Sequence, residues 1–139
     1  IVTVTKPDGT PYGLTVNSFN SVSLTPPLIL WSLDNKNSHL TLFQNTAGYA
    51  INIMAADQTH LCKRFAGQES NRFADVDWTV GASGQPLINN ALAHIECRPW
   101  QNYAGGDHTI FVGEVVSARH LSDRPAAAFF KGQLGHYES

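Results

Sequence analysis

The sequence has little of what metal-binding and common catalytic motifs require. Its only two cysteines, Cys62 and Cys97, lie far apart and form no CxxC pair. None of the six histidines forms an HxxxH pair, and the histidines and cysteines do not form a cluster with metal-site spacing, which argues against a metal site. A P-loop, a GxSxG elbow and a Rossmann GxGxxG fingerprint are also missing. Any nucleotide must therefore bind without these motifs.

Charge is scarce as well. Charged residues make up 14% of the 139 residues, compared with about 25% in ordinary soluble domains. We infer that much surface is buried, in a tight core, in an oligomer interface or in both. The net charge of −2 does not favour nucleic acid or an anionic membrane as a partner.

Long apolar runs are missing too. No run approaches the roughly 20 residues of a membrane span, and no signal peptide is recognisable. We interpret the cysteines as two free, buried thiols of a cytoplasmic protein, with a single disulfide as the alternative. The length fits one domain over residues 1–139.

Short strands separated by turns dominate the pattern. Apolar alternation or continuous apolarity predicts strands over residues 1–5, 12–17, 28–33, 49–53, around 77–80, 91–98 and 108–116. Two short helices are predicted, over 39–46 with Asn37 or Ser38 as N-cap and over 58–66 with Asp57 as N-cap. The expected fold class is mainly β: a closed or split antiparallel β-barrel with short peripheral helices.

Three further features shape this expectation. Gly113, in the middle of a strand, indicates a bulge or a close backbone approach. Residues 68–85 form a long polar excursion of the kind that often serves as a lid or a binding element. The apolar tail over residues 126–137 is expected to pack on the barrel or on a partner subunit.

The stretch over residues 12–27 is rich in serine and asparagine. We interpret it as a strand that runs into a short polar loop and returns to the core at Leu28. Such a loop offers neutral hydrogen-bonding groups and no charge, which suits a planar, uncharged ligand group better than a metal or a phosphate. The alternative is an ordinary turn.

Two other places offer candidate chemistry. Lys36 and Ser38 lie where the first helix is expected to begin, which predicts an anion site, although many helix starts look similar. His108 opens a strand after a Gly-Gly-Asp turn, and such a histidine is either structural or functional.

Three motifs in this sequence resemble one known family. The first is Gly-Leu-Thr-Val-Asn-Ser-Phe-Asn-Ser-Val-Ser-Leu-Thr-Pro-Pro-Leu over residues 13–28, and the second is Gly-Asp-His-Thr-Ile-Phe-Val-Gly-Glu-Val over 106–115. A weaker third is Gly-Gln-Pro-Leu at 84–87, leading into Ala-Leu-Ala at 91–93. In this order they are similar to the flavin reductase-like family, the FMN-binding split barrels.

The resemblance implies an enzyme, an NAD(P)H:flavin oxidoreductase that transfers hydride to FMN or FAD. NADH or NADPH would be the co-substrate, and the reduced flavin would pass to a partner monooxygenase. A homodimer is also implied, as is a helix before the first strand. An electron carrier of the same fold without NAD(P)H turnover, or a binding module that has lost flavin, are the alternatives.

The resemblance also implies site residues. His108 would position the nicotinamide and would not act as an acid or a base. The residues expected to bind the flavin are Thr15, Val16, Asn17, Ser18, Ser32, Lys36, Ser38, His39, Phe65 and Ala66. Phe65 and Ala66 are interpreted first as core residues, and Phe-x-Gly at 130–132 is not followed by the aromatic residue that relatives often carry.

Overall fold

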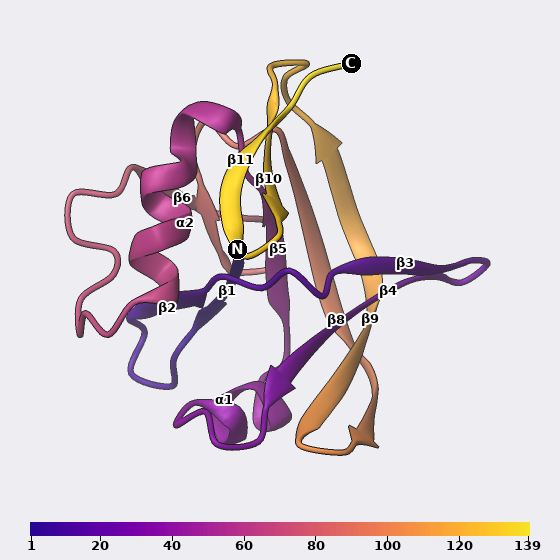
Figure 1. The fold of residues 1–139 in the computed structure, drawn as a ribbon. Helices are drawn as coiled ribbons and strands as arrows, with labels where there is room; N and C mark the ends of the chain where they lie inside the picture. Colours follow the sequence, from indigo (N-terminus) through magenta and orange to yellow (C-terminus); the bar gives the residue numbers. More distant parts are fainter.

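A computed structural model describes all residues, 1–139, and shows a mainly β protein (Figure 1). Its strands are β1 (Val2–Thr5), β2 (Pro11–Leu14), β3 (Asn20–Leu24), β4 (Pro27–Asp34), β5 (Tyr49–Ile53), β6 (Trp78–Val80), β7 (Pro86–Ile88), β8 (Ala93–Gly105), β9 (His108–His120), β10 (Ala126–Phe130) and β11 (Gln133–Tyr137). Its helices are α1 (Leu40–Asn45), the 3₁₀ turn η1 (Ala56–Gln58) and α2 (Thr59–Ala66).

The main sheet has seven antiparallel strands in the order β2-β1-β5-β8-β9-β4-β3. The two edge strands, β2 and β3, are neighbours in sequence but do not pair with each other. Residues 15–19 cross from one edge to the other. This confirms the expected split antiparallel barrel with peripheral helices, and it leaves unpaired backbone groups at the split.

The core of the barrel is aromatic. Trp31 on β4 is fully buried and stacks on Phe111 of β9 with ring centroids 4.7 Å apart. The ring of Tyr49 packs edge-on against Trp31, with centroids 5.5 Å apart. A Cβ at Gly113 would lie 2.3 Å from the Tyr49 hydroxyl oxygen, so the predicted close approach at this glycine is confirmed.

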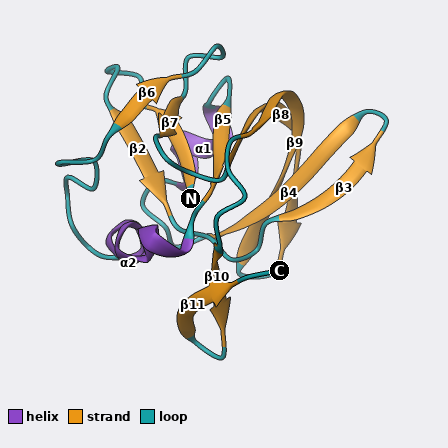
Figure 2. Cartoon of the chain, turned by 90° about the horizontal axis from the view of Figure 1, so that it is seen from above, coloured by secondary structure: helices purple, strands orange, loops and turns teal.

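The polar loop predicted after residue 17 is wrong in part. The strand β2 ends at Leu14, and β3 pairs with β4 as a hairpin that projects from the body (Figures 1 and 2). The apolar residues of β3 do not point into the core, because Val22 and Leu24 are 49% and 93% exposed. Val22 and Leu24 do alternate with Ser21 and Ser23, as side chains of a strand do, but this short serine-rich run was interpreted as part of a polar loop.

The paired strands β8 and β9 are longer than predicted. The alternation pattern ended the first at residue 98, and proline, which follows at residue 99, is rare inside a strand. In the structure Pro99 lies at a register shift of the β8–β9 ladder, where a bulge accommodates it, and β8 continues to Gly105. The turn before His108 is correspondingly shorter than the predicted one.

Both helices lie where they were predicted, but their N-caps differ. His39 is the N-cap of α1, and no side chain bonds to the end of that helix. The Asn37 Oδ1 instead accepts a hydrogen bond of 2.8 Å from the His39 amide. The segment before α2 begins with η1, where Gln58 Oε1 accepts from the Ala55 amide at 3.1 Å. Asp57, the predicted N-cap, does not cap α2, and its carboxylate accepts a hydrogen bond from Arg124 instead.

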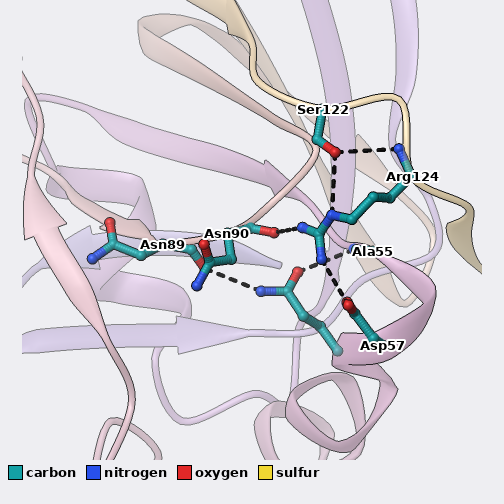
Figure 3. A network of polar contacts seen from close by, with 7 residues as sticks. Ala55, Asp57, Asn89, Asn90, Ser122 and Arg124 are labelled. Carbon is teal, nitrogen blue, oxygen red and sulfur yellow. Dashed lines mark hydrogen bonds and ion pairs between the residues drawn. The ribbon is translucent and has the colours of Figure 1, made fainter.

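Asp57 belongs to a polar network that ties the chain after β9 to the start of α2 (Figure 3). Arg124 donates to Asp57 Oδ2 at 2.7 Å, to Ser122 Oγ at 3.1 Å and to the Asn90 carbonyl. Because these partners come from three separate segments, the network fixes the direction in which the chain enters β10.

The remaining segments complete the body. The excursion over 68–85 contains β6, as predicted, and β7 follows it and pairs with it. The tail forms the β10–β11 hairpin, and Ala127 and Leu134 pack against the buried cluster beneath α2. Cys62 and Cys97 are free and buried, as expected, and form no disulfide. No helix has the length and apolarity needed to cross a bilayer.

Candidate functional site

The split between the edge strands opens into a hollow of about 290 Å³, here called the central pocket. It lies between the crossing segment, the end of β4, the end of α2 and the start of β9. Its lining residues are Leu14, Thr15, Val16, Asn17, Ser18, Ser32, Leu33, Asp34, Asn37, Phe65, Ala66, Arg72 and His108. Most of the residues that the sequence proposed for flavin binding therefore meet here.

The crossing segment presents neutral polar groups to this pocket. Thr15 and Ser18 hold the segment in place: Thr15 Oγ1 donates to the Cys62 carbonyl at 2.7 Å, and Ser18 Oγ accepts from the Ser32 amide at 2.8 Å. Asn17 is exposed, and its side chain has no partner in the protein. None of the backbone N–H groups of residues 16–18 donates within the protein either. These groups are available to a ligand.

His108 reaches the central pocket from the start of β9, where its backbone pairs with Asp34 of β4. Its Nδ1 lies 2.7 Å from Asp107 Oδ1, and its side chain is 44% exposed. This hydrogen bond is the main reason why the pKa of Asp107 lies below its ordinary value. The contact orients the ring and leaves Nε2 for a ligand.

The end of α2 closes another side of the pocket. Phe65 is fully buried, so it is the core residue that the sequence suggested, and it also lines the pocket. Its ring requires a glycine on β2, since a Cβ at Gly13 would lie 2.9 Å from Phe65 Cε1. Ala66 is exposed beside it, so the first interpretation of Ala66 as a core residue is wrong. Helix and strand therefore approach closely at the split.

Arg72 is a lining residue that the sequence analysis missed. Its guanidinium donates to the Gly13 carbonyl at 2.8 Å, to the Gly67 carbonyl at 2.7 Å and to the Tyr12 hydroxyl at 3.2 Å. The Nε atom is buried and has no acceptor within the protein. Arg72 lies in the excursion after α2, where no periodicity or motif distinguished it from other surface cations.

A second hollow, of about 440 Å³, adjoins the central pocket and shares Asn37 and Arg72 with it. We call it the basic hollow. It is lined by Lys6, Pro11, Tyr12, Lys36, Asn37, Ser38, His39, Gln68, Glu69, Ser70, Asn71, Arg72 and Phe73. The proposed residues Lys36, Ser38 and His39 lie here and do not line the central pocket. The segments that form it lie toward the lower left of Figure 1.

An aromatic pair forms part of the basic hollow. The rings of Tyr12 and His39 stack with centroids 3.8 Å apart and an interplanar angle of 17°. The Arg72 guanidinium lies 5.4 Å from the Tyr12 centroid. Burial, and then the charges of Lys6 and Arg72, hold the pKa of His39 below its ordinary value. Three cations and one carboxylate line the hollow, so its lining carries net positive charge.

The donor set fits a flavin better than it fits a metal or a covalent reaction. No group of three or more His, Cys, Asp or Glu side chains is placed to hold a metal ion. The free amide groups of residues 16–18 suit the hydrogen-bonding edge of a planar, uncharged ring, and the unpartnered Arg72 Nε suits a phosphate. The residues present thus match both ends of a flavin nucleotide.

Comparison with known proteins also indicates a flavin-binding protein. The family model described as flavin reductase like domain matches residues 1–138. The chain is 43% identical to the FMN reductase (NADH) SmoA of Agrobacterium fabrum, covering 99% of this chain and 77% of that protein. It is 31% identical to HsaB of Rhodococcus jostii, the reductase subunit of a flavin-dependent monooxygenase, covering 95% of this chain and 68% of that one.

Among solved structures, the NADH:FAD oxidoreductase SgcE6 of Streptomyces globisporus, in complex with NAD and FAD fragments, superposes with a TM-score of 0.91. The two sequences are 37% identical, and the match covers 98% of this chain and 82% of that one. The resemblance of the sequence motifs is thereby confirmed. This chain belongs to the flavin reductase-like family.

Proposed function

We propose that this protein is an NADH:flavin oxidoreductase whose central pocket holds the flavin ring. Family membership supports the enzyme class, and relatives whose names specify NADH favour that nucleotide over NADPH. When bound, the flavin accepts a hydride that the nicotinamide supplies, so the two cofactors carry the redox chemistry. The observation that carries the proposal is the meeting of the crossing segment, the end of α2 and His108 around one hollow.

Each lining group has a binding or orienting role. Asn17 and the free amides of residues 16–18 hold the edge of the ring, while Thr15 and Ser18 keep the segment in shape through their internal hydrogen bonds. Phe65 provides apolar contact, and Arg72, with Lys36 and Ser38, holds the flavin phosphate. Asp107 orients His108, and His108 positions the nicotinamide.

The reduced flavin is supplied to a partner monooxygenase. The naming of HsaB as a reductase subunit supports this assignment. A cytoplasmic location and a one-domain organisation over residues 1–139 are part of the same proposal, in keeping with the two free thiols.

We also propose a homodimer. The exposed side chains of Val22 and Leu24 on the projecting β3–β4 hairpin, together with the exposed Phe129, offer apolar surface for a second copy. Sedimentation velocity should give the mass of two chains, and Leu24→Asp should shift the equilibrium toward one chain. A wild-type protein that sediments as a monomer at high concentration would contradict the dimer.

The enzymatic proposal is tested by following NADH and NADPH oxidation in air by the purified protein, with and without added FMN or FAD. We expect oxidation of NADH that depends on added flavin. A protein that binds flavin but oxidises neither nucleotide would be an electron carrier and would overturn the proposal. If the protein binds no flavin, the proposal is also overturned, and only the assignment of the fold remains.

A further inference from the structure

We propose that Asn35 is a positioning residue, which holds His108 in place by fastening the turn between β8 and β9 to the end of β4. The proposal rests on the proposed function, because it takes His108 as the residue that positions the nicotinamide. Asn35 follows directly after β4 and lines neither the central pocket nor the basic hollow. Any effect that it has on NADH must therefore pass through another residue.

Packing does not fix the side chain of His108. This side chain is 44% exposed, and the residue opens β9 directly after the turn residues Gly106 and Asp107. The turn lies at the lower end of the β8–β9 ribbon in Figure 1. Asp107 is itself 88% exposed, and its hydrogen bond to His108 joins two neighbouring residues. This bond orients the ring relative to the turn, so the place of the ring in the pocket depends on how the turn is held.

The pairing of β4 with β9 holds this turn only in part. The ladder ends at the pair Asp34–His108, and the turn residues Gly106 and Asp107 lie beyond it. Asn35 is the first residue after the ladder on the other side. Its backbone amide donates to the Asp107 carbonyl at 2.9 Å, so it continues the connection past the last strand pair.

The side chain of Asn35 adds two hydrogen bonds to the same turn. Its Nδ2 donates to the Gly106 carbonyl at 3.3 Å, and its Oδ1 accepts from Thr109 Oγ1 at 2.7 Å. These partners flank Asp107 and His108 in sequence, so one carboxamide holds both sides of the pair that reaches the site. A carboxamide suits this place because it carries a donor and an acceptor, whereas a carboxylate only accepts.

The segment between β4 and α1 does not depend on this carboxamide. Asp34 Oδ1 accepts from the Lys36 amide at 2.8 Å, and the Asp34 carbonyl accepts from the Asn37 amide at 2.9 Å. Both side-chain bonds of Asn35 are exposed, so their loss should change the overall stability little. Removal of the side chain should therefore loosen the turn and leave the flavin-binding residues in place.

The test is steady-state NADH oxidation by the full chain at saturating FMN, with FMN affinity measured by fluorescence titration. Asn35→Ala should raise the KM for NADH about fivefold, and Thr109→Val, which removes one of the two bonds, about threefold. Thr109→Ser keeps the hydroxyl and should behave as wild type. The Kd of FMN should change in none of them. The matched control is Asn102→Ala, which removes an exposed side chain on β8 that bonds to no other residue.

A double substitution shows whether Asn35 acts through His108. In the His108→Ala variant, the further change Asn35→Ala should not raise the KM again, because the ring that the turn positions is already gone. Independent effects that multiply would show that Asn35 acts on NADH by another route and would overturn the inference. An equal rise in the KM for NADH and the Kd of FMN in Asn35→Ala would overturn it too.

Amide hydrogen exchange tests the fastening of the turn without any turnover. The protection factor of the residue 35 amide, which donates to the Asp107 carbonyl, should fall about tenfold in Asn35→Ala and stay at its wild-type value in Asn102→Ala. Unaltered protection, with NADH kinetics impaired in His108→Ala, would overturn this inference alone. Unaltered NADH kinetics in His108→Ala, with protection lost in Asn35→Ala, would instead overturn the role that the proposed function gives to His108.

Discussion

The central pocket and the basic hollow share a boundary but differ in chemistry. The first is lined by hydroxyls, amides and free backbone N–H groups, and Asp34, His108 and Arg72 are its ionisable side chains. The second holds three cations, a stacked aromatic pair and one carboxylate. The first region is therefore suited to an uncharged, planar group, and the second to an anionic one.

Arg72 connects the two regions. Its hydrogen bonds fasten the excursion after α2 to β2, while the same guanidinium faces both hollows. One side chain therefore supports the fold and supplies charge to the site.

The largest effect is expected from Arg72→Ala, which affects both regions at once. The change leaves the Gly13 and Gly67 carbonyls without their donor, so the free energy of unfolding should fall by about 2 kcal/mol in urea denaturation. FMN and FAD should both bind more weakly. The control is Arg64→Ala, which removes one hydrogen bond to the Ala74 carbonyl and should cost less. Equal losses in the two variants would contradict this role.

The next largest effect is expected from His108→Ala, which distinguishes nicotinamide binding from flavin binding in the central pocket. His108→Ala should raise the KM for NADH about tenfold, because it removes one positioned contact, while flavin affinity changes little. Steady-state kinetics at saturating flavin measure the first and fluorescence titration the second. The control is His120→Ala, at the far end of the same strand. Unaltered NADH kinetics in His108→Ala would remove His108 from the site.

A smaller effect is expected from Asn17→Ala, which tests the neutral character of the central pocket. Loss of one uncharged hydrogen bond should weaken FMN and FAD by the same factor, about fivefold. The ratio of the two dissociation constants should stay at its wild-type value. Asn20→Ala, on the exposed strand β3, is the matched control. A change in the FAD to FMN ratio would show that the two regions do not act separately.

The smallest effect is a pH dependence in the basic hollow. Burial and the charges of Lys6 and Arg72 lower the pKa of His39, with Lys36 and Glu69 also lining the hollow. A histidine whose folded pKa is depressed favours the folded state above its unfolded pKa of about 6.5, and this contribution is lost as the pH falls below that value. Wild type should therefore lose more thermal stability than His39→Gln between pH 7.5 and pH 5.

The control for this comparison is His136→Gln, at an exposed position on β11. It should follow the wild-type pH dependence. If His39→Gln follows the wild type as well, the positive potential of the hollow does not act on His39.

Most of the barrel could be predicted from the sequence, since alternation or continuous apolarity marks a strand with at least one buried face. The strand β3 was missed although Val22 and Leu24 alternate with serines, because a short serine-rich run with only two apolar side chains resembles a polar loop. The strand β8 was predicted too short, because a bulge that accommodates Pro99 depends on the pairing with β9 and not on local sequence.

For the site, the sequence by itself determined the family and the neutral segment at residues 15–18, because a contiguous motif carries both. Only the tertiary structure decided that the proposed residues divide between two hollows, with Lys36, Ser38 and His39 in the basic one. The place of Arg72 between the two hollows was also visible only in the structure, because it depends on hydrogen bonds to β2 and to the end of α2. The physical reason is that pattern and motif are local, whereas a pocket is formed by segments that meet only when the chain has folded.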